Sequence, residues 1–397
     1  MQNVIPGGDD GWGVFLRARA LRAARHDIVE LTIGEHDIPT DPAILDAMDR
    51  AARAGAVGYA PVPGTPELRE AVADWVTKRG GVPTSAREVL IVPGGQAGLF
   101  AAHLCALDPG QSGLFPDPFY ATYPGTVRAA GGRPVPVATA ASAGFVPTAE
   151  AILATAGAAE AAGNAAGSLL INTPNNPTGA VYDAAALDAI MAAAALAGLW
   201  VISDEVYDGQ VWEGRHVSAR AAPGARDRTL VVGSMSKSFA MTGSRLGWIV
   251  GPEAAIASLS DLATHTTYGV PGFIQAAALW ALTEGGAALE ARVAAPFARR
   301  RAQVTAVLGA CAALSVLPMR GGMYAFVDIR ATGLSGTAFA NALLDDAQIA
   351  VMPGESFGAS GAGHVRVALT APDRVFEQAL HGIAAFADRH AARAQAP

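Results

Sequence analysis

Three short apolar runs recur along the chain, at 168–171 (SLLI), 199–202 (LWVI) and 230–233 (LVVG), with about thirty residues from one to the next. That spacing is typical of βαβ units, in which two parallel strands are joined through a helix. Two further runs, 89–92 (VLIV) and 113–116 (GLFP), precede them. Runs this short and apolar indicate strands buried on both faces. The sequence therefore predicts an α/β fold with an open, mostly parallel sheet covered by helices, from about residue 59 to residue 280.

Helical periodicity appears on both sides of these runs. Residues 66–81 (PELREAVADWVTKRGG) carry Leu68, Val72 and Val76 at helical spacing between a proline and a glycine, which predicts a helix. Beyond residue 280 the pattern changes: 291–311 predicts a long helix, 321–329 and 363–369 predict alternating strands, and the tail from 372 a last helix. We expect a large domain at 46–283 and a smaller α+β domain at 284–397, which the segment 1–45 joins.

Composition narrows the class of partner. The net charge of −7 and the pI near 5.6 disfavour nucleic acid and membranes as partners, because both require clustered Lys and Arg. Cys105 and Cys311 are too few for a disulfide framework or a thiolate zinc site, and the histidines have no metal-ligand spacing. The first residues (MQNVIPGGDDGWG) resemble no signal peptide. We therefore expect a cytoplasmic protein that binds small molecules and no metal.

Polar residues follow three of the predicted strands directly. The run at 168–171 leads into NTPNNPTG, the run at 199–202 into SDEVY, and the run at 230–233 into SMSK. In open α/β sheets, ligands bind beyond the carboxyl ends of the strands. We therefore expect Asn176, Asp204, Tyr207 and Lys237 to share one crevice.

This set of side chains suits one cofactor. A lysine among small and apolar residues is desolvated and can form a Schiff base with an aldehyde, which pyridoxal phosphate supplies. The pyridine nitrogen of that cofactor requires a buried carboxylate, for which Asp204 is the candidate. Its phosphate requires backbone N–H groups at a helix start, hydroxyls and a guanidinium. The candidates for the phosphate are Gly94, Gly95, Gln96, Ala97, Ser234, Ser236 and Arg245.

Seven motifs then identify a family. They are YAPVPGTPELREAVA, PGGQAGLF, DPFYATYPG, NTPNNPTG, SDEVYDG, SMSKSFAMTGSRLGW and HVRVALT. In this order they resemble the fold-type I, pyridoxal-phosphate-dependent aminotransferases related to aspartate aminotransferase, over nearly the whole chain. The resemblance implies a mostly parallel seven-stranded sheet with helices on both faces, a smaller α+β domain, a homodimer, and transfer of an amino group from an amino acid to a 2-oxo acid.

The resemblance also implies a role for each candidate residue. Lys237 would bind the cofactor covalently and carry the proton, while Asp204 pairs with its ring nitrogen. Asn176 and Tyr207 would bond its phenolic oxygen, and Tyr120 would stack on its ring. The phosphate would be held by Gly95, Gln96, Ala97, Ser234, Ser236, Arg245 and, from the neighbouring subunit, Tyr59. Gly34, Asn176 and Arg366 would bind the substrate, with Arg366 and Gly34 at its carboxylate. His36 and Ile38 depart from the family's GEPDF loop.

The substrate side chain is less constrained. No Lys or Arg occurs between Arg245 and Arg292, where some dicarboxylate-specific relatives have an arginine, which disfavours aspartate as the donor. The segments 262–279 and 328–344 look like those of arginine–pyruvate transaminases. We therefore expect a basic donor, with pyruvate or 2-oxoglutarate as acceptor, and with Glu35, Asp37 or Asp208 as the carboxylate that meets its side chain.

Alternatives remain open at this point. The same cofactor supports elimination, oxidation or dehydration of an amino acid. The GESFG motif at 354–358 matches the elbow of serine hydrolases, with Ser356 as nucleophile and Asp373 and His381 downstream, but a strand follows it where a helix is required. A dinucleotide oxidoreductase is disfavoured because the sequence has no GxGxxG motif.

Overall fold

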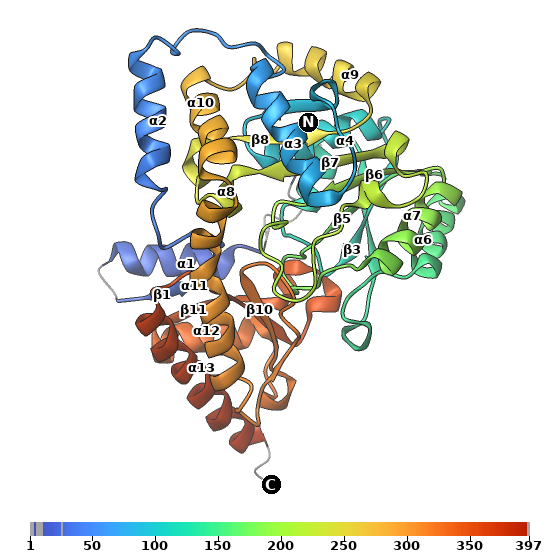
Figure 1. Cartoon of the computed structure of the whole chain (residues 1–397). Coiled ribbons are helices and arrows are strands. Elements are labelled where there is room, and N and C mark those ends of the chain that lie inside the picture. The colour runs from blue at the N-terminus through green and yellow to red at the C-terminus, as the bar shows by residue number, and fades with distance from the viewer. Residues whose placement is uncertain (1–3, 5–10, 25–26, 395–397) are drawn as a thin grey trace.

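Two β-sheets, each covered by helices, make up the molecule (Figure 1). The structure is a computed structural model that describes residues 4, 11–24 and 27–394. We call the seven-stranded sheet the large sheet and the five-stranded one the small sheet. No helix among the described residues is long and apolar enough to cross a membrane.

The large sheet confirms the predicted parallel architecture. Across the sheet its strands are β2 (Val89–Val92), β8 (Gly247–Val250), β7 (Thr229–Ser234), β6 (Trp200–Asp204), β5 (Ala166–Asn172), β3 (Ser112–Asp117) and β4 (Arg133–Ala138). All of the adjacent pairs are parallel except the two that involve β8, which runs against both neighbours. The carboxyl ends of β5, β6 and β7 therefore lie side by side.

Sequence analysis missed β4 and β8. Strand β4 contains Pro134 and Pro136, which cannot donate to a ladder and weaken the strand pattern. It lies at the edge of the large sheet, where prolines are tolerated because the outer side of an edge strand has no partner. Strand β8 begins inside the motif around Lys237, where glycines interrupt the apolar run.

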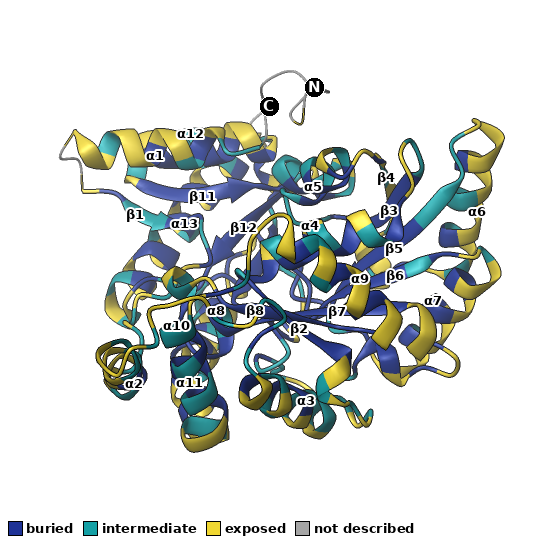
Figure 2. Ribbon diagram, turned by 90° about the horizontal axis from the view of Figure 1, so that it is seen from above, coloured by how far each residue is buried: buried dark blue, intermediate teal, exposed yellow. Residues whose placement is uncertain are grey.

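Helices cover both faces of the large sheet, as alternation along the strands requires. Leu90 and Val92 pack with α4 (Gly95–Ala106), α5 (Tyr123–Ala129) and α9 (Glu253–Thr264), whereas Val89 and Ile91 pack with the opposite layer. That opposite layer contains α3 (Pro66–Gly80), α6 (Ala149–Ala161), α7 (Ala184–Leu196) and α10 (Gly272–Trp280). In Figure 2 the buried strands run between α4 on one side and α3 on the other. A further helix, α2 (Pro42–Arg53), packs against α10 (Figure 1).

The predicted helix at 66–81 is confirmed as α3, and its ends have clear causes. The Thr65 side chain caps the first turn by accepting the N–H of Leu68, and Pro66 has the fixed φ that a first turn needs. Gly81 ends the helix in the left-handed region at φ 73°, which glycine adopts without strain.

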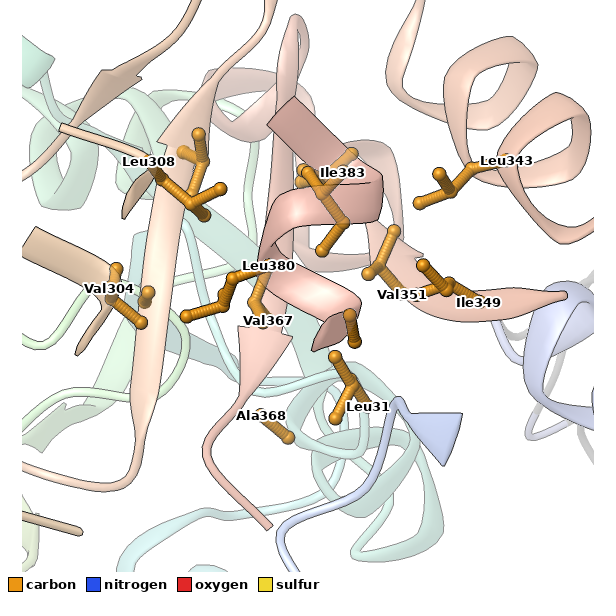
Figure 3. Packing of buried hydrophobic residues seen from close by; sticks show 14 of the residues in the cluster. Leu31, Val304, Leu308, Leu343, Ile349, Val351, Val367, Ala368, Leu380 and Ile383 are labelled. Atoms are coloured by element: carbon orange, nitrogen blue, oxygen red, sulfur yellow. The ribbon is translucent and has the colours of Figure 1, made fainter. Parts of the chain in front are cut away.

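The small sheet combines segments from both ends of the chain. Its order is β1 (Val29–Leu31), β11 (Ile349–Pro353), β12 (His364–Ala368), β10 (Tyr324–Asp328) and β9 (Ser315–Val316). Strand β1 pairs in parallel with β11, so the N-terminal segment is part of this sheet. The covering helices are α1 (Gly13–Ala23), α12 (Gly336–Ala347) and α13 (Asp373–Ala394). One core forms where Leu31, Val351 and Val367 meet Leu380 and Ile383 of α13 (Figure 3).

One long helix connects the part of the molecule built on the large sheet with the part built on the small sheet. Helix α11 (Gly286–Val307) begins beside the large sheet, where Leu289 and Val293 are buried in one core. It ends in the core of the small sheet, where Val304 packs (Figures 1 and 3). A short π-helical turn, Ala281–Gly285, precedes it, and Gly286 has a φ of 49°. The loop 32–41 is the second connection between the two sheets.

Candidate active site

A cavity of about 290 Å³ lies where β5, β6 and β7 end and the small sheet faces the large one. Of the fourteen residues to which the family resemblance gives a role, all but two line it. They are Gly34, Gly95, Gln96, Tyr120, Asn176, Asp204, Tyr207, Ser234, Ser236, Lys237, Arg245 and Arg366. Residues from the two sheets therefore meet in one space, and the four residues expected to share a crevice, Asn176, Asp204, Tyr207 and Lys237, are among them.

Lys237 lies on the short helix α8 (Met235–Ser238), which directly follows β7. Its Nζ atom donates a hydrogen bond of 2.5 Å to the carbonyl of Gly34, which belongs to the loop 32–41. Burial lowers the pKa of the Lys237 amine, because a desolvated ammonium is less stable than a hydrated one. This amine is therefore closer to its nucleophilic, neutral form than a surface lysine is.

Asp204 is the last residue of β6 and is 4% exposed. Burial raises the pKa of its carboxyl from 3.8 to about 6, and hydrogen bonds from Tyr123 and the Val206 N–H offset part of that rise. The Tyr123 hydroxyl donates to Oδ2 at 2.7 Å. A buried carboxylate with one strong donor can accept a further charged partner, as a protonated ring nitrogen would be.

Tyr207 and Asn176 present a phenol and an amide to the same space. The Tyr207 hydroxyl lies 3.2 Å from the hydroxyl of Tyr324, and the Asn176 Oδ1 accepts 2.7 Å from Arg366. The Asn176 backbone N–H donates to Asn172, whose side chain in turn donates to the Asp204 carbonyl. These bonds link the loop after β5 to the end of β6.

Arg366 is the most deeply buried cation of the site, at 1% exposed. It lies on β12, with its guanidinium between the rings of Tyr324 and Phe357, at 4.2 and 4.4 Å from their centroids. It donates to Asn176 and to the Thr32 carbonyl, while its Nε has no partner among the described atoms. A guanidinium that is held in place, lines a cavity and retains an unpartnered donor suits a carboxylate ligand.

The opposite end of the cavity fits a phosphate. The N-terminus of α4 meets Ser234, Ser236 and Arg245 there, so backbone N–H groups, hydroxyls and a guanidinium converge. Gly94 has a φ of 83°, and a Cβ at this position would lie 2.3 Å from an Arg245 nitrogen. Glycine is therefore required beside Arg245. The amine, carboxylate, phenol, amide and phosphate donors together match the chemical groups of pyridoxal phosphate, so the residues fit that cofactor.

Two of these fourteen residues, Ala97 and Tyr59, lie outside this cavity. Ala97 lines a neighbouring groove of about 1150 Å³, which shares Gln96 and Arg245 with the cavity. Tyr59 is 91% exposed and packs edge-on against Tyr268, at 5.1 Å between ring centroids. Tyr59 therefore makes no contribution to the cavity of its own chain.

Sequence analysis missed Tyr123 and Tyr324, which both line the cavity. Tyr123 lies three residues after Tyr120 in DPFYATYPG and begins α5, where the sequence alone reads it as an aromatic core residue. Tyr324 begins β10, and in GGMYAF it reads as one aromatic residue of a core strand. Its hydroxyl gave no signal in the sequence.

The serine-hydrolase alternative is wrong. Ser356 lies in a short 3-10 helix and donates its Oγ proton to the Gly11 carbonyl at 2.6 Å. The required acid, Asp373, forms ion pairs with Arg299 and Arg300 instead. Among the residues that the structure describes, the serine therefore has neither a general base nor the strand–turn–helix context of a nucleophile elbow.

Comparison with known proteins gives the same assignment as the geometry. The sequence pattern of the family described as aminotransferase class I and II matches residues 26–383. The arginine–pyruvate transaminase of Pseudomonas aeruginosa is 38% identical over 383 residues, covering 96% of each chain. The aspartate/prephenate aminotransferase of Thermus thermophilus is 35% identical over 376 residues, covering 94% of each.

Solved structures agree. The aspartate aminotransferase of Thermus thermophilus with maleate superimposes with a TM-score of 0.88 at 33% identity, covering 95% of this chain and 96% of that one. The aspartate aminotransferase of Rhizobium meliloti gives a TM-score of 0.89 at 30% identity, covering 97% of both. The predicted fold type, cofactor class and enzyme class are thus confirmed. The chain belongs to the class I and II aminotransferase family and is a pyridoxal-phosphate-dependent aminotransferase.

Proposed function

We propose that this enzyme takes the α-amino group from an L-amino acid with a cationic side chain, such as arginine, and gives it to pyruvate or 2-oxoglutarate in a ping-pong sequence. The observation that carries the reaction is the meeting of the Lys237 amine, the buried Asp204 carboxylate and the Arg366 guanidinium in one cavity. An amine nucleophile, a partner for a ring nitrogen and a carboxylate receptor are the parts that amino-group transfer requires.

Each residue of the cavity has a separate proposed role, which follows from its position. When bound, pyridoxal phosphate supplies an aldehyde for the lysine and a protonated ring that withdraws electrons from the substrate α-carbon. Lys237 would hold the cofactor and would carry the proton at the substrate α-carbon. Asp204 would keep the ring nitrogen protonated, Tyr207 and Asn176 would donate to the phenolic oxygen, and Tyr120 would cover the ring face. Arg366, beside Gly34, holds the substrate carboxylate and so orients the α-carbon.

Around the phosphate we propose backbone donors from Gly95, Gln96 and Ala97, with Ser234, Ser236 and Arg245 as side-chain donors. Tyr59 would complete this end from a second copy of the chain in a homodimer. Its 91% exposure and its place outside the cavity of its own chain support that contribution. The groove beside Arg245 leaves room for a partner's side chain.

We also propose the domain division 1–45 with 284–397, and 46–283. Separate buried cores under the small and large sheets support it. A cytoplasmic location is proposed as well, and the unpaired thiols of Cys105 and Cys311 support it.

The first prediction separates transfer from elimination, oxidation and dehydration. The cofactor-loaded enzyme mixed with an amino acid alone is expected to turn over once, with loss of the visible cofactor band and about one oxo acid formed per site, since the amino group stays on the enzyme. Addition of pyruvate or 2-oxoglutarate is expected to restore the band. Absorbance and oxo-acid assays measure both steps. Continuous ammonia release without an acceptor would identify a lyase, a dehydratase or an oxidase instead.

A cationic donor is supported by the charges that surround the cavity. Asp37 is paired with Arg300 at 2.8 Å, and Asp208 lies beside Arg79, in a different cavity. Glu35 lines the cavity, is exposed, and forms no hydrogen bond or ion pair with the described residues. Of the three carboxylates that the sequence offered, Glu35 is therefore the one available to a ligand.

The basic groups of the cavity also support a cationic donor. Among the described lining residues, Lys237, Arg245 and Arg366 are the cations, and each has a proposed task. No cation among the described lining residues therefore remains for a distal carboxylate, such as that of aspartate. An arginine–pyruvate transaminase is also among the similar proteins, which adds support for a guanidino donor.

The second prediction concerns Glu35→Gln. Removal of this charge is expected to lower kcat/KM for arginine by about five- to tenfold, the size of one partly solvated charged hydrogen bond, with little effect on a neutral donor of similar length. Initial rates with arginine, lysine, norleucine and aspartate would measure it. Glu70→Gln, an exposed change on α3, is the matched control. An equal loss for arginine and norleucine, or wild-type turnover of aspartate at or above that of arginine, would reject the cationic-donor proposal.

A further inference from the structure

The hydroxyl of Tyr324 occupies a position that the roles proposed above do not use. Tyr324 is 4% exposed, and within the described chain its hydroxyl has one hydrogen-bond partner, the hydroxyl of Tyr207 at 3.2 Å. The Tyr207 hydroxyl in turn has no other hydrogen-bond partner there, and the ring centroid of Tyr207 lies 5.9 Å from the Lys237 Nζ. The two phenols therefore form a closed pair beside the amine.

The ring of Tyr324 is held on two sides. Its face lies under the Arg366 guanidinium, at 4.2 Å from Cζ to the ring centroid. Its hydroxyl lies against Gly34, where an added Cβ would be 1.9 Å from the Tyr324 oxygen. Glycine at position 34 therefore provides the space that this hydroxyl fills, and the same residue accepts the Lys237 hydrogen bond through its carbonyl. The position of the Tyr324 oxygen is thus determined by packing and by charge.

The direction of the bond between the two phenols follows from counting protons. Each phenol has one proton to give. If Tyr207 donates its proton to the cofactor's phenolic oxygen, its own oxygen can only accept in the pair, and Tyr324 becomes the donor. In a buried site with low dielectric, such a chain of two donors strengthens the second hydrogen bond.

We propose that Tyr324 is a positioning residue that donates to Tyr207 and thereby directs the Tyr207 proton at the cofactor's phenolic oxygen. This inference rests on the proposed placement of the cofactor between Lys237 and Tyr207. It assigns Tyr324 two separable contributions: the ring supports Arg366, and the hydroxyl supports Tyr207.

The third prediction is a double-mutant cycle at the two phenols, with Tyr324→Phe, Tyr207→Phe and the double variant. The readout is the pH midpoint of the visible absorbance change of the cofactor-loaded enzyme without substrate. A donor to the phenolic oxygen weakens that oxygen as an internal acceptor for the proton on the lysine-linked nitrogen, so loss of the donor raises the midpoint. Tyr324→Phe is expected to raise it by about 0.5 to 1 pH unit, which corresponds to one modest hydrogen bond. Tyr207→Phe is expected to raise it further.

The double variant tests whether Tyr324 acts on the cofactor through Tyr207 or independently of it. If Tyr324 acts through Tyr207, the double variant has the midpoint of Tyr207→Phe alone. The KM for the amino donor stays within about twofold in Tyr324→Phe, because the ring under Arg366 is retained. Tyr182→Phe removes a buried, unpartnered hydroxyl outside the cavity and is expected to leave the midpoint unchanged.

Four outcomes overturn the inference. An unchanged midpoint in Tyr324→Phe shows that its hydroxyl does not support Tyr207. Additive shifts in the double variant show independent action, and a raised KM with an unchanged midpoint assigns the hydroxyl to the substrate. An unchanged midpoint in Tyr207→Phe overturns the proposed cofactor placement itself, and this inference with it. A shift in Tyr207→Phe together with none in Tyr324→Phe rejects only the inference.

Discussion

Replacement of Lys237 by alanine is expected to abolish the visible cofactor band and to lower the transamination rate by at least about 10⁴-fold. The variant loses both the nucleophile that binds the cofactor and the base that moves the α-proton, and each effect is large on its own. Absorbance of the cofactor-treated protein and initial rates with the best amino donor measure the two losses.

The chain offers a matched control, because its only other lysine is Lys78 on the outer side of α3. Lys78→Ala is expected to retain the band and the rate. Borohydride reduction of the cofactor-loaded wild type, followed by peptide mass analysis, is expected to find the cofactor on Lys237 and not on Lys78. Attachment at Lys78, or a retained band in Lys237→Ala, would contradict the assignment of the whole site.

The second large effect concerns Asp204→Asn, which is expected to lower the rate by about 10³-fold while it stabilises the cofactor-free fold. The neutral amide cannot keep the ring nitrogen protonated, so the rate falls. In the cofactor-free protein, however, the carboxylate is a buried charge, and burial raises its pKa from 3.8 to about 6. Loss of that charge removes a cost of about 3 kcal/mol at pH 8.

The sign of the pH dependence follows from those two values. Below about pH 4 the carboxyl is protonated in both the folded and unfolded chains, so the cost is absent. Between about pH 4 and 6 only the unfolded chain ionises, and the stability of the wild type falls as the pH rises. Urea unfolding of the cofactor-free proteins at pH 4 and pH 8 measures the difference. Asp183→Asn, which replaces the cap of α7 by an equally good cap, is the control.

An Asp204→Asn variant that is less stable than the wild type at pH 8 would mean that the Tyr123 hydrogen bond outweighs the cost of the buried charge. In that case Asp204 would act mainly as a structural link between β6 and α5. Retention of more than about a tenth of the activity would likewise remove Asp204 from its proposed partnership with the ring nitrogen.

The residues that follow the strand ends were the part of the site that could be predicted from the sequence. Lys237, Asp204 and Asn176 each follow an apolar run within a few residues, so a local pattern with the βαβ rule was enough to bring them together. Arg366 was found through its motif and through strand alternation, and the structure buries it beside Asn176.

Contacts between distant segments were not accessible in this way. Tyr324 is 117 residues from Tyr207, and nothing near either of them indicates that their hydroxyls meet. Tyr123 was concealed because a buried tyrosine resembles any other aromatic core residue until its hydroxyl partner is known. The edge strand β4 was missed because a free outer side permits prolines, and the position of a strand within a sheet is not a local property.

The helix that joins the two sheets is long enough to convert a small change of angle at one end into a large displacement at the other. Helix α11 has 22 residues, which corresponds to a length of about 33 Å. A tilt of about 5° at its glycine-led start therefore displaces its far end by about 3 Å, which is comparable to the length of a hydrogen bond. Lys237 follows a strand of the large sheet and Arg366 lies on a strand of the small one, so a change of angle at Gly286 would change the distance between the amine and the carboxylate receptor. We therefore expect substitutions at Gly286, which lies outside the cavity, to change which substrates fit.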